Sequence, residues 1–349
     1  MSHSLKIWID LENSPHVLFF QPIIDRLRSM GHSVEVTARN FCNTVALAEA
    51  RGLDARVIGS GYDKGRKLLA KYSLIGLRTL QLAAYARGRG FDVAASHGSR
   101  TQALAAKLTG VPLFSSQDYE FNDLRAFRWA KRFMIPTLVP ADPYIAQGVP
   151  KAAIRRYQGL KEEVYLAGFS PSADVRSELG VPDDAVMVVF RPKATQAHYG
   201  SGQESDLDRE LMERAAAQDD AYLIVLPRTE SQRADLAAAW GDHPRVVLPE
   251  GVVDGPSLMY AADLVATGGG TMVREAVALG VPAASLFQGT EGAVDHALKQ
   301  QGRLVAVREP GDLDRLFPVG RRERDSGASE TGPLESVTDC ILDAATTPK

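Results

Sequence analysis

The sequence predicts an α/β protein with two doubly wound domains that face a central cleft. Short apolar runs alternate with longer helical periods along the chain, and the alternation restarts after a less regular stretch near residues 160–180. Because the apolar runs are nearly continuous, we expect parallel strands that are covered by helices on both faces. A chain of 349 residues is long for one core and sufficient for two domains of ordinary size.

The first series predicts a domain over residues 1–165. Its expected strands are 5–9, 33–38, 55–58, 93–96, 113–116 and 137–139, and its expected helices are 18–30, 44–50, 64–87 and 101–108. Gly31 and Gly52 follow two of these helices, at the position where glycine commonly ends a helix.

The second series predicts a domain over residues 166–349. Its expected strands are 186–190, 221–226, 246–248, 264–266, 283–287 and 304–306, and its expected helices are 206–218, 231–240, 257–262, 293–301 and 334–345. The charged and polar stretch 321–333 predicts a mobile loop. We expect the last helix to pack back to the domain junction.

Composition excludes several classes of protein. A net charge of −3 with 45% hydrophobic and 24% charged residues is ordinary for a globular protein and does not indicate a nucleic-acid binder. Cys42 and Cys340 lie far apart and outside any metal-binding spacing, which favours two reduced thiols. With no signal peptide and no apolar run of ~18 residues, the expected location is the cytoplasm.

The most informative motif joins a short apolar run, 264–266, to the three glycines Gly268, Gly269 and Gly270 and then to a helical pattern. Glycine allows close approach of a ligand, and the free N–H groups of a first helical turn attract anions. Thr271 is expected to cap the helix, and Glu275 to receive hydroxyl groups beside a bound phosphate. The alternative is a tight turn that binds nothing.

Cations follow two neighbouring strands of the same domain. Arg191 and Lys193 come after the strand at 186–190, and Arg228 comes after the strand at 221–226. Because ligands bind off the carboxyl ends of parallel strands, these side chains are predicted to bind a diphosphate. The alternative is that they form surface ion pairs.

A second candidate site follows the first strand, in the segment from Asp10 to Pro22. His16 is placed to act as a general base, because the pKa of a histidine can lie near neutrality. Asn13 and Ser14 precede it and are predicted to contact a nucleotide sugar. The alternative is a histidine that satisfies backbone groups at the start of a helix.

The segment around His16-Val17 and Gly31-His32 resembles the "GHV-x-P … L-x-x-x-G-H-x-V-x-x-x-T" opening of GT-B glycosyltransferases. The glycine motif and the stretch 286–297 resemble the nucleotide-sugar segment of the same enzymes. The resemblance implies a GT-B-like fold with Glu275 on the ribose and with Gln288 and Glu291 near sugar hydroxyls.

The stretches 97–102 and 111–120 resemble UDP-N-acetylglucosamine 2-epimerases, which share this fold and contain "HGDTTT … IP-x-x-HVEAG". Ser99 stands where the resemblance would place the catalytic aspartate, and serine cannot serve as a carboxylate base. Asp118 or Glu120 remains as a nearby carboxylate. The whole chain most resembles a family of bacterial and archaeal proteins of this fold with no assigned function.

Together these features predict a metal-independent glycosyltransferase, of the kind that acts in polysaccharide biosynthesis. It would use a nucleotide-diphosphate sugar, expected to be UDP-linked, and an unidentified acceptor, with no cofactor. No Asp-x-Asp element follows a strand of the first domain, and leaving-group charge would fall on helix N–H groups and arginines. The alternatives are a 2-epimerase that uses Asp118 or Glu120, and a non-catalytic nucleotide-sugar binder.

Residues 64–89 combine basic side chains, Arg78 among them, with an apolar face. A basic amphipathic helix of this kind can lie on anionic lipid, which predicts weak association with a membrane surface. The alternative is a helix that covers the sheet and exposes a cationic side to solvent.

Overall fold

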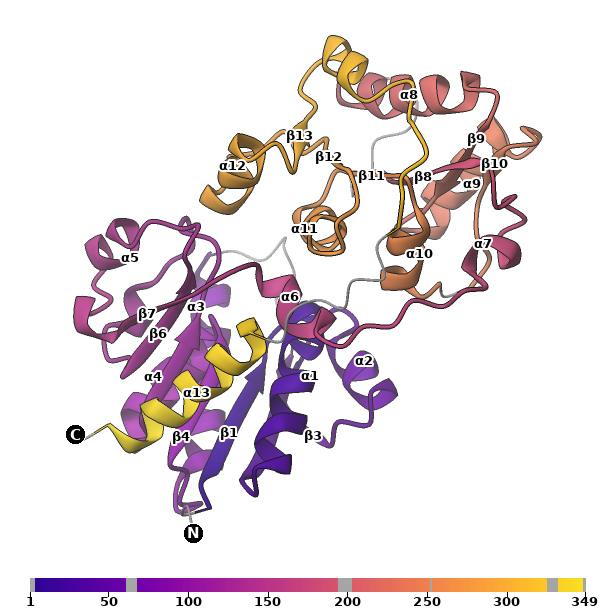
Figure 1. The fold of residues 1–349 in the computed structure, drawn as a ribbon. Coiled ribbons are helices and arrows are strands. Elements are labelled where there is room, and N and C mark those ends of the chain that lie inside the picture. The colour runs from indigo at the N-terminus through magenta and orange to yellow at the C-terminus, as the bar shows by residue number, and fades with distance from the viewer. Residues whose placement is uncertain (1–3, 61–67, 194–202, 252, 325–331, 348–349) are drawn as a thin grey trace. The chain divides into compact units, whose positions relative to one another are not determined.

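A computed structural model describes residues 4–60, 68–193, 203–251, 253–324 and 332–347 (Figure 1). The chain forms two compact units, one of residues 1–167 with 330–349 and the other of residues 168–329. Each unit contains a sheet whose paired strands run parallel. The predicted fold class, an α/β protein with two doubly wound domains, is therefore confirmed.

Within the described residues, the sheet of the first unit has the strand order β3-β2-β1-β4-β5-β6-β7. Its strands are β1 (Lys6–Leu11), β2 (Ser33–Asn40), β3 (Ala55–Ser60), β4 (Val93–His97), β5 (Leu113–Ser116), β6 (Arg132–Pro136) and β7 (Ile154–Tyr157). Its helices are α1 (Ser14–Ser29), α2 (Thr44–Ala50), α3 (Leu68–Ala86), α4 (Arg100–Thr109), α5 (Asp142–Ala146), α6 (Lys161–Leu166) and α13 (Gly332–Thr346), with 3-10 turns η1 (Arg125–Phe127) and η2 (Lys151–Ala153). The strand order reverses between β1 and β4, which is where such sheets leave a crevice for a ligand.

The sheet of the second unit has the order β10-β9-β8-β11-β12-β13 over the described residues. Its strands are β8 (Val186–Arg191), β9 (Ala221–Val225), β10 (Val246–Val247), β11 (Leu264–Thr267), β12 (Ala283–Ser285) and β13 (Val305–Ala306). Its helices are α7 (Val175–Glu178), α8 (Gln203–Ala217), α9 (Glu230–Trp240), α10 (Gly255–Ala261), α11 (Gly270–Ala278) and α12 (Ala293–Gln300), with the 3-10 turn η3 (Pro310–Arg315). Here the order reverses between β8 and β11.

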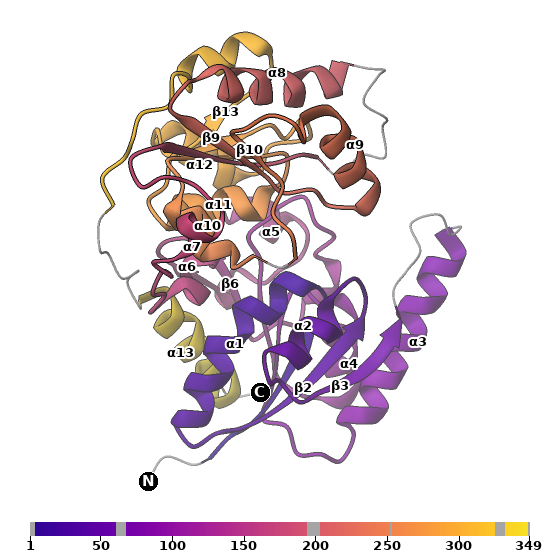
Figure 2. The same cartoon turned by 90° about the vertical axis from the view of Figure 1, so that its right-hand side faces the viewer.

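Helices cover the first sheet on both faces, as the buried strands require. On one face of the sheet, α1 packs against α2, α6 and α13. On the other face, α3 packs against α4 (Figure 2). The strand β1 is buried almost throughout, and α1 turns Val17, Phe20, Ile24 and Leu27 inward at helical spacing. Strands and helices therefore form from the two hydrophobic periods that the sequence contains.

One predicted strand of the first domain is wrong. Residues 137–139 form a turn, and the strand lies at Arg132–Pro136, where only three apolar residues separate an arginine from a proline. Edge strand β7 contains Arg155 and Arg156 and has no apolar run to reveal it. Arg156 of β7 donates to the carbonyl oxygens of Thr137 and Val139, at 3.3 and 3.2 Å, and so stabilises the turn at 137–139.

The last helix belongs to the first unit. Val337, Cys340 and Ile341 of α13 lie in the same buried core as Ile9 of β1 and Val93 of β4. The predicted range of the second domain, 166–349, includes these residues, whereas their apolar face completes the cover of the first sheet. A boundary drawn by sequence order cannot represent this return of the chain.

Part of the predicted mobile loop is held in place. Arg322 donates its backbone N–H to buried Asp263 at 3.0 Å, and the guanidinium groups of Arg321 and Arg324 lie 3.4 and 3.8 Å from the same carboxylate. Residues 321–324 thus neutralise a buried charge and are not a free loop. Residues 325–331 of that prediction lie outside the described residues.

The carboxylate of Asp10, at the end of β1, is completely buried and accepts hydrogen bonds from three side chains. The hydroxyls of Thr37 and Ser99 each donate at 2.7 Å, and the guanidinium of Arg78 donates at 2.8 and 3.1 Å. Arg78 itself is 2% exposed. Its assignment to a solvated basic face of 64–89 is therefore wrong, because its helical position turns it toward the sheet.

Gly59 makes room for this arginine. The Nε of Arg78 donates to the carbonyl oxygen of Ile58 at 2.9 Å, which draws the side chain against β3. A Cβ at residue 59 would lie 2.7 Å from the Cδ of Arg78, and the backbone there has a φ of +81°. Glycine is required at this position for both reasons.

We expect Arg78→Met to destabilise the first unit by about 3–5 kcal/mol, because it leaves the buried Asp10 carboxylate without its cation. Chemical denaturation measures this free energy of unfolding. The double variant Asp10→Asn, Arg78→Met should recover part of the loss, and Arg51→Met, at an exposed arginine, should stay within about 0.5 kcal/mol of wild type. A loss below about 1 kcal/mol in the single variant would contradict the role assigned to the pair.

Candidate functional site

In the second unit, the carboxyl ends of three adjacent strands bring the predicted cations to the turn formed by Gly268, Gly269 and Gly270, here called the glycine turn. Thr267 of β11 pairs with Arg191 of β8, and the backbone N–H of Gly268 donates to the Arg191 carbonyl oxygen at 3.2 Å. A Cβ at residue 268 would lie 3.1 Å from the Cα of Lys193 and would overlap its Cγ. The absence of a side chain at Gly268 therefore allows Lys193 to pack directly against the turn.

Arg228, at the end of β9, reaches the same turn. A Cβ at Gly269 would lie 2.8 Å from its Nη2, and its Nε donates to the carbonyl oxygen of Pro192 at 2.8 Å. Gln232 of α9 fixes both sides of this contact: it accepts from the Arg228 backbone N–H at 2.8 Å and donates to the Lys193 carbonyl oxygen at 3.1 Å. The two cations are thus positioned by backbone contacts.

Helix α11 starts at Gly270, and its N-cap is Gly269, in an extended conformation without a side-chain cap. The prediction that Thr271 caps this helix is wrong, because Thr271 lies within the first turn. The Thr267 hydroxyl instead accepts from the Gly269 backbone N–H at 3.1 Å. With no capping side chain, the first turn keeps N–H groups for a ligand.

Cations outnumber carboxylates at this turn, where the buried Asp208 accepts from the Lys193 backbone N–H at 3.4 Å. Burial, and then the charge of Arg191, lower the pKa of the Arg228 guanidinium to about 10, against the opposing charge of Asp208. The Nζ of Lys193 is buried and has no hydrogen-bond partner among the described residues. Both observations indicate cations held where a bound anion would stabilise them.

A cavity of about 530 Å³ opens beside this turn within the second unit. Lys193 and Gln288, both predicted to bind a nucleotide sugar, line it together with Arg308. The other lining residues are Asp206, Leu207, Glu309 and Pro310. The structure therefore brings residues that follow β8, β12 and β13 to one cavity.

The two predicted carboxylates differ in their surroundings. Glu275 lies in the second turn of α11 and is partly buried. Glu291 forms ion pairs with Lys299 at 2.8 Å and with Arg308 at 3.6 Å, and its carboxylate lies 3.7 Å from His296 Nδ1. A sugar hydroxyl would have to share Glu291 with the two cations.

In the first unit, four side chains contact one another in sequence, and two of them are predicted catalytic residues. This histidine cluster consists of His16, His97, Asp118 and Lys161. The rings of His16 and His97 lie 5.2 Å apart in an edge-on arrangement. His97 Nε2 lies 3.1 Å from Asp118 Oδ1, and Lys161 donates to Asp118 Oδ2 at 2.7 Å. The other ring nitrogen of His97 lies 2.9 Å from the Ser116 hydroxyl.

Burial lowers the pKa of His16 well below its ordinary value, and the neighbouring His97 and Lys161 lower it further, against the opposing charge of Asp118. The ring is therefore neutral at pH 7. Because the backbone N–H of Glu12 donates to its Nδ1 at 3.2 Å, the neutral ring carries its proton on Nε2. A base that uses Nδ1 must exchange this backbone hydrogen bond for the substrate.

Asn13 and Ser14 lie at the beginning of α1, where Asn13 is the N-cap in an extended conformation and accepts from the His16 backbone N–H at 2.9 Å. Glu120 is buried, and its carbonyl oxygen accepts from Gln147 at 3.3 Å. This contact places it toward the C-terminal end of α5, whereas Asp118 contacts the histidine cluster.

Sequence reasoning missed Lys161 and the role of His97. His97 ends β4, and Ser116 is its register partner on β5, so the convergence of strand ends was the available signal. Lys161 lies 43 residues from Asp118 in the chain, and no spacing rule connects them.

Ser99 has a structural role in this chain. It is the N-cap of α4 and accepts from the backbone N–H of Gln102 at 3.3 Å, while its hydroxyl donates to Asp10. The position therefore holds no carboxylate.

The fold and these sites define a GT-B-type protein of two Rossmann-like domains with a cationic glycine turn in the second. Residues 5–343 match the family model described as "Protein of unknown function (DUF354)", and the chain belongs to that family. It is 25% identical over 314 residues to the "Uncharacterized protein MJ0665" of Methanocaldococcus jannaschii, a match that covers 88% of this chain and 89% of the relative.

Solved structures share the fold. The UDP-GlcNAc 2-epimerase from Methanocaldococcus jannaschii superposes with a TM-score of 0.73 at 15% identity, over 97% of this chain and 99% of the other. The UDP-GlcNAc 2-epimerase from Neisseria meningitidis bound to UDP-GlcNAc gives 0.72 at 13% identity, over 97% and 99%. The glycotransferase of kitacinnamycin gives 0.62 at 16% identity, over 98% and 96%. At these identities the likeness shows the GT-B fold.

Among the described residues, no helix is both long enough and apolar enough to span a membrane.

The pKa of His16 predicts a pH dependence of stability. In the unfolded chain this histidine gains a proton below a pKa of ~6.5, whereas in the folded protein it stays neutral, so stability falls as the pH falls. Between pH 7.5 and 5.5 the loss from this residue is about 1.4 kcal/mol. Denaturation curves at the two pH values should show a smaller loss, by about that amount, in His16→Gln. An identical pH dependence in both proteins would show that His16 titrates normally in the folded state.

Proposed function

We propose that this protein is an enzyme that transfers a sugar from a nucleotide-diphosphate sugar to an acceptor hydroxyl, without a metal ion. The observation that carries the proposal is the meeting of Lys193, Arg228 and the open first turn of α11 at Gly268 and Gly269. Donors of this kind suit a diphosphate, which bears charge on oxygens that can accept from several N–H groups at once.

In the proposed reaction the acceptor oxygen forms a bond to the anomeric carbon as the bond to the diphosphate oxygen breaks. The negative charge that develops on the leaving diphosphate is stabilised by the α11 N–H groups together with Arg191, Lys193 and Arg228. The adjoining cavity of about 530 Å³ is of a size that holds part of a nucleotide sugar, with Gln288 among its walls. Glu275 is assigned to the ribose and Glu291 to sugar hydroxyls.

The acceptor proton passes to His16 in this proposal. Burial keeps the ring neutral, which a base requires, and the proton would enter Nδ1 in place of the Glu12 N–H. Asp118 then stabilises the imidazolium through His97. The absence of a carboxylate at Ser99 favours transfer over epimerisation, since no aspartate stands where the epimerase resemblance would place one.

A second candidate is a 2-epimerase, favoured by Asp118. This carboxylate lies 3.1 Å from His97 Nε2 and accepts from Lys161 at 2.7 Å, so its orientation is fixed on both oxygens. Two of the solved structures that share this fold are UDP-GlcNAc 2-epimerases. An epimerase converts a nucleotide sugar without any acceptor, which separates the two candidates.

Nucleotide binding tests the anion site. In a thermal-shift screen of UDP, GDP, dTDP and ADP with their sugar conjugates, a ligand present at 100 times its Kd should add about 2.7 kcal/mol to the stability of the wild type. Arg228→Met should weaken the affinity for that ligand about 10- to 100-fold, as expected for loss of a charge-assisted hydrogen bond. Arg209→Met is the matched control, because Arg209 lies on α8 with its side chain 59% exposed. If no nucleotide shifts the melting temperature, the glycine turn is structural.

Turnover separates the candidates once the nucleotide is known. Incubation of the sugar nucleotide with the enzyme alone, followed by proton NMR, should leave the sugar unchanged if the protein is a transferase. Addition of an acceptor-containing cell extract should then release the nucleoside diphosphate at a rate that His16→Ala lowers about 100-fold or more. Formation of the 2-epimer without acceptor would establish the second candidate. Tight binding with no turnover in either mixture would identify a non-catalytic binder.

A further inference from the structure

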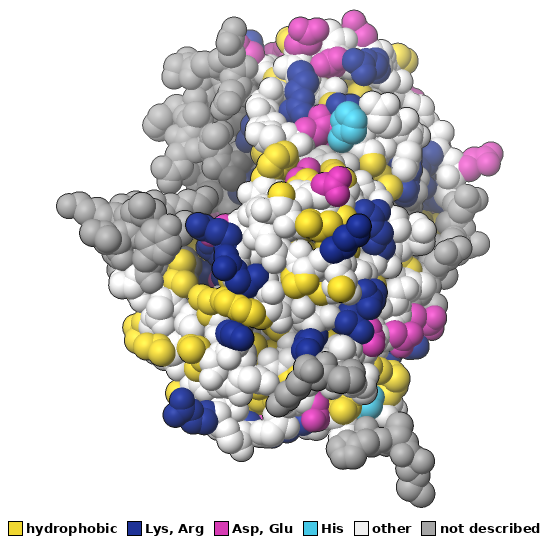
Figure 3. Space-filling model, turned by 90° about the vertical axis from the view of Figure 1, so that its left-hand side faces the viewer, with side chains coloured by type: hydrophobic (Ala, Val, Ile, Leu, Met, Phe, Trp, Pro, Cys, Tyr) yellow, Lys and Arg dark blue, Asp and Glu magenta, His cyan; other side chains and the backbone are white. Residues whose placement is uncertain are grey.

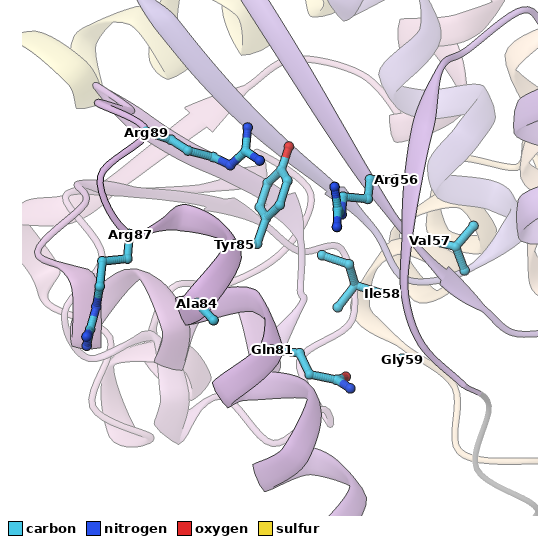
Figure 4. A pocket seen from close by; sticks show the side chains of 9 residues that line it. All are labelled: Arg56, Val57, Ile58, Gly59, Gln81, Ala84, Tyr85, Arg87 and Arg89. Carbon is cyan, nitrogen blue, oxygen red and sulfur yellow. The ribbon is translucent and has the colours of Figure 1, made fainter.

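The outer edge of the first sheet carries a cavity that the nucleotide-sugar site does not use. Edge strand β3 and helix α3 enclose a volume of about 660 Å³ (Figure 4). Three arginines line it, Arg56 from β3 and Arg87 and Arg89 from the turn that follows α3, together with Tyr85 and Gln81. Among the described residues, the lining contains no acidic side chain, so the cavity suits a negatively charged group.

Tyr85 organises two of these cations. The guanidinium carbons of Arg89 and Arg56 lie 4.3 and 5.7 Å from the centre of its ring, one on each side in Figure 4. The Tyr85 hydroxyl donates to Glu35 at 2.6 Å, and burial together with that carboxylate raises the pKa of Tyr85 to about 12. The ring is therefore a fixed platform that stays uncharged.

Two of the three arginines form no ion pair with a described residue. Arg89 pairs with Glu35 at 3.2 Å, whereas the side chains of Arg56 and Arg87 are exposed and make no hydrogen bond or ion pair within the described residues. Uncompensated arginines beside a cavity attract anionic groups from solution.

Large apolar side chains stand exposed next to these cations. Val57 of β3 is 48% exposed, and Leu77 and Leu80 of α3 are 54% and 63% exposed. Leu77 lies one helical turn before Gln81, which lines the cavity, so both occupy one face of the helix. Figure 3 shows a face of the molecule on which hydrophobic side chains lie directly beside lysine and arginine side chains.

We propose that this α3–β3 surface, formed by Arg56, Val57, Leu77, Leu80 and Arg87, binds the anionic headgroups of a lipid bilayer. A free phosphate would use the arginines and leave the leucines in water, whereas a bilayer accepts both: phosphates pair with the guanidinium groups, and the leucines enter the boundary between headgroups and acyl chains. The proposal is independent of the reaction assigned to the nucleotide-sugar site.

Co-sedimentation of the full chain with vesicles tests the surface. We expect binding to phosphatidylcholine vesicles that contain about one-third phosphatidylglycerol, and little binding to phosphatidylcholine alone. Arg56→Gln with Arg87→Gln should weaken binding about 30-fold, since each arginine near an anionic membrane is worth roughly a factor of five. Leu77→Ser with Leu80→Ser should weaken it roughly 10-fold or more.

The matched control is Arg51→Gln with Leu108→Ser, which removes an exposed arginine and a leucine that is 60% exposed elsewhere on the same unit. It should bind like wild type, and thermal melting should confirm that all three variants are folded. Equal binding by the control and both surface variants would overturn the proposal, as would failure of the wild type to bind anionic vesicles. If inorganic phosphate stabilises the wild type but not the arginine variant, and the leucine variant binds vesicles normally, the cavity holds a free anion and the bilayer assignment is wrong.

Discussion

The buried pair of Asp10 and Arg78 is the constraint on which the first unit depends. Their contacts join β1 to β2 through Thr37, to β3 through the Ile58 carbonyl, and to the beginning of α4 through Ser99. Two charges removed from water are tolerated only when every lone pair and N–H finds a partner, and this geometry supplies them. The first turn of α1, which carries His16, closely follows the end of β1 at Leu11, and His97 lies two residues before Ser99. The pair therefore fixes the origins of both histidine-bearing segments.

Much of the fold could be predicted from the sequence, because both parallel sheets are buried and their strands are apolar runs. The exceptions are informative: β6 has only three apolar residues between Arg132 and Pro136, and β7 is an edge strand in which two arginines can stay partly exposed. Arg78 was misassigned for a related reason. Periodicity shows which face of a helix is apolar, but a buried arginine is recognisable only when its carboxylate partner, 68 residues away, is known.

The anion site could be predicted better than the histidine cluster. Arg191, Lys193 and Arg228 follow strands, and the carboxyl ends of adjacent parallel strands must meet, so topology alone brings them to the glycine turn. Lys161 lies on a short helix far along the chain, and its contact with Asp118 depends on how α6 packs. The prediction that Thr271 caps α11 was wrong because, with three glycines in a row, the backbone can begin the helix two residues earlier and without a capping side chain.

The cationic turn is costly to the folded protein in the absence of a ligand. Burial and the proximity of Arg191 lower the pKa of Arg228, which means that the charged form is less favourable there than in water. Lys193 contributes a buried amino group without a hydrogen bond among the described residues, a further cost. A core that needed only stability would place apolar side chains at these strand ends. In the proposed function, a bound diphosphate would offset the repulsion between Arg191 and Arg228 and accept a hydrogen bond from Lys193, which would offset part of this cost. The same reasoning applies to His16, whose neutral ring is maintained by burial and by neighbouring cations at the expense of stability in acid.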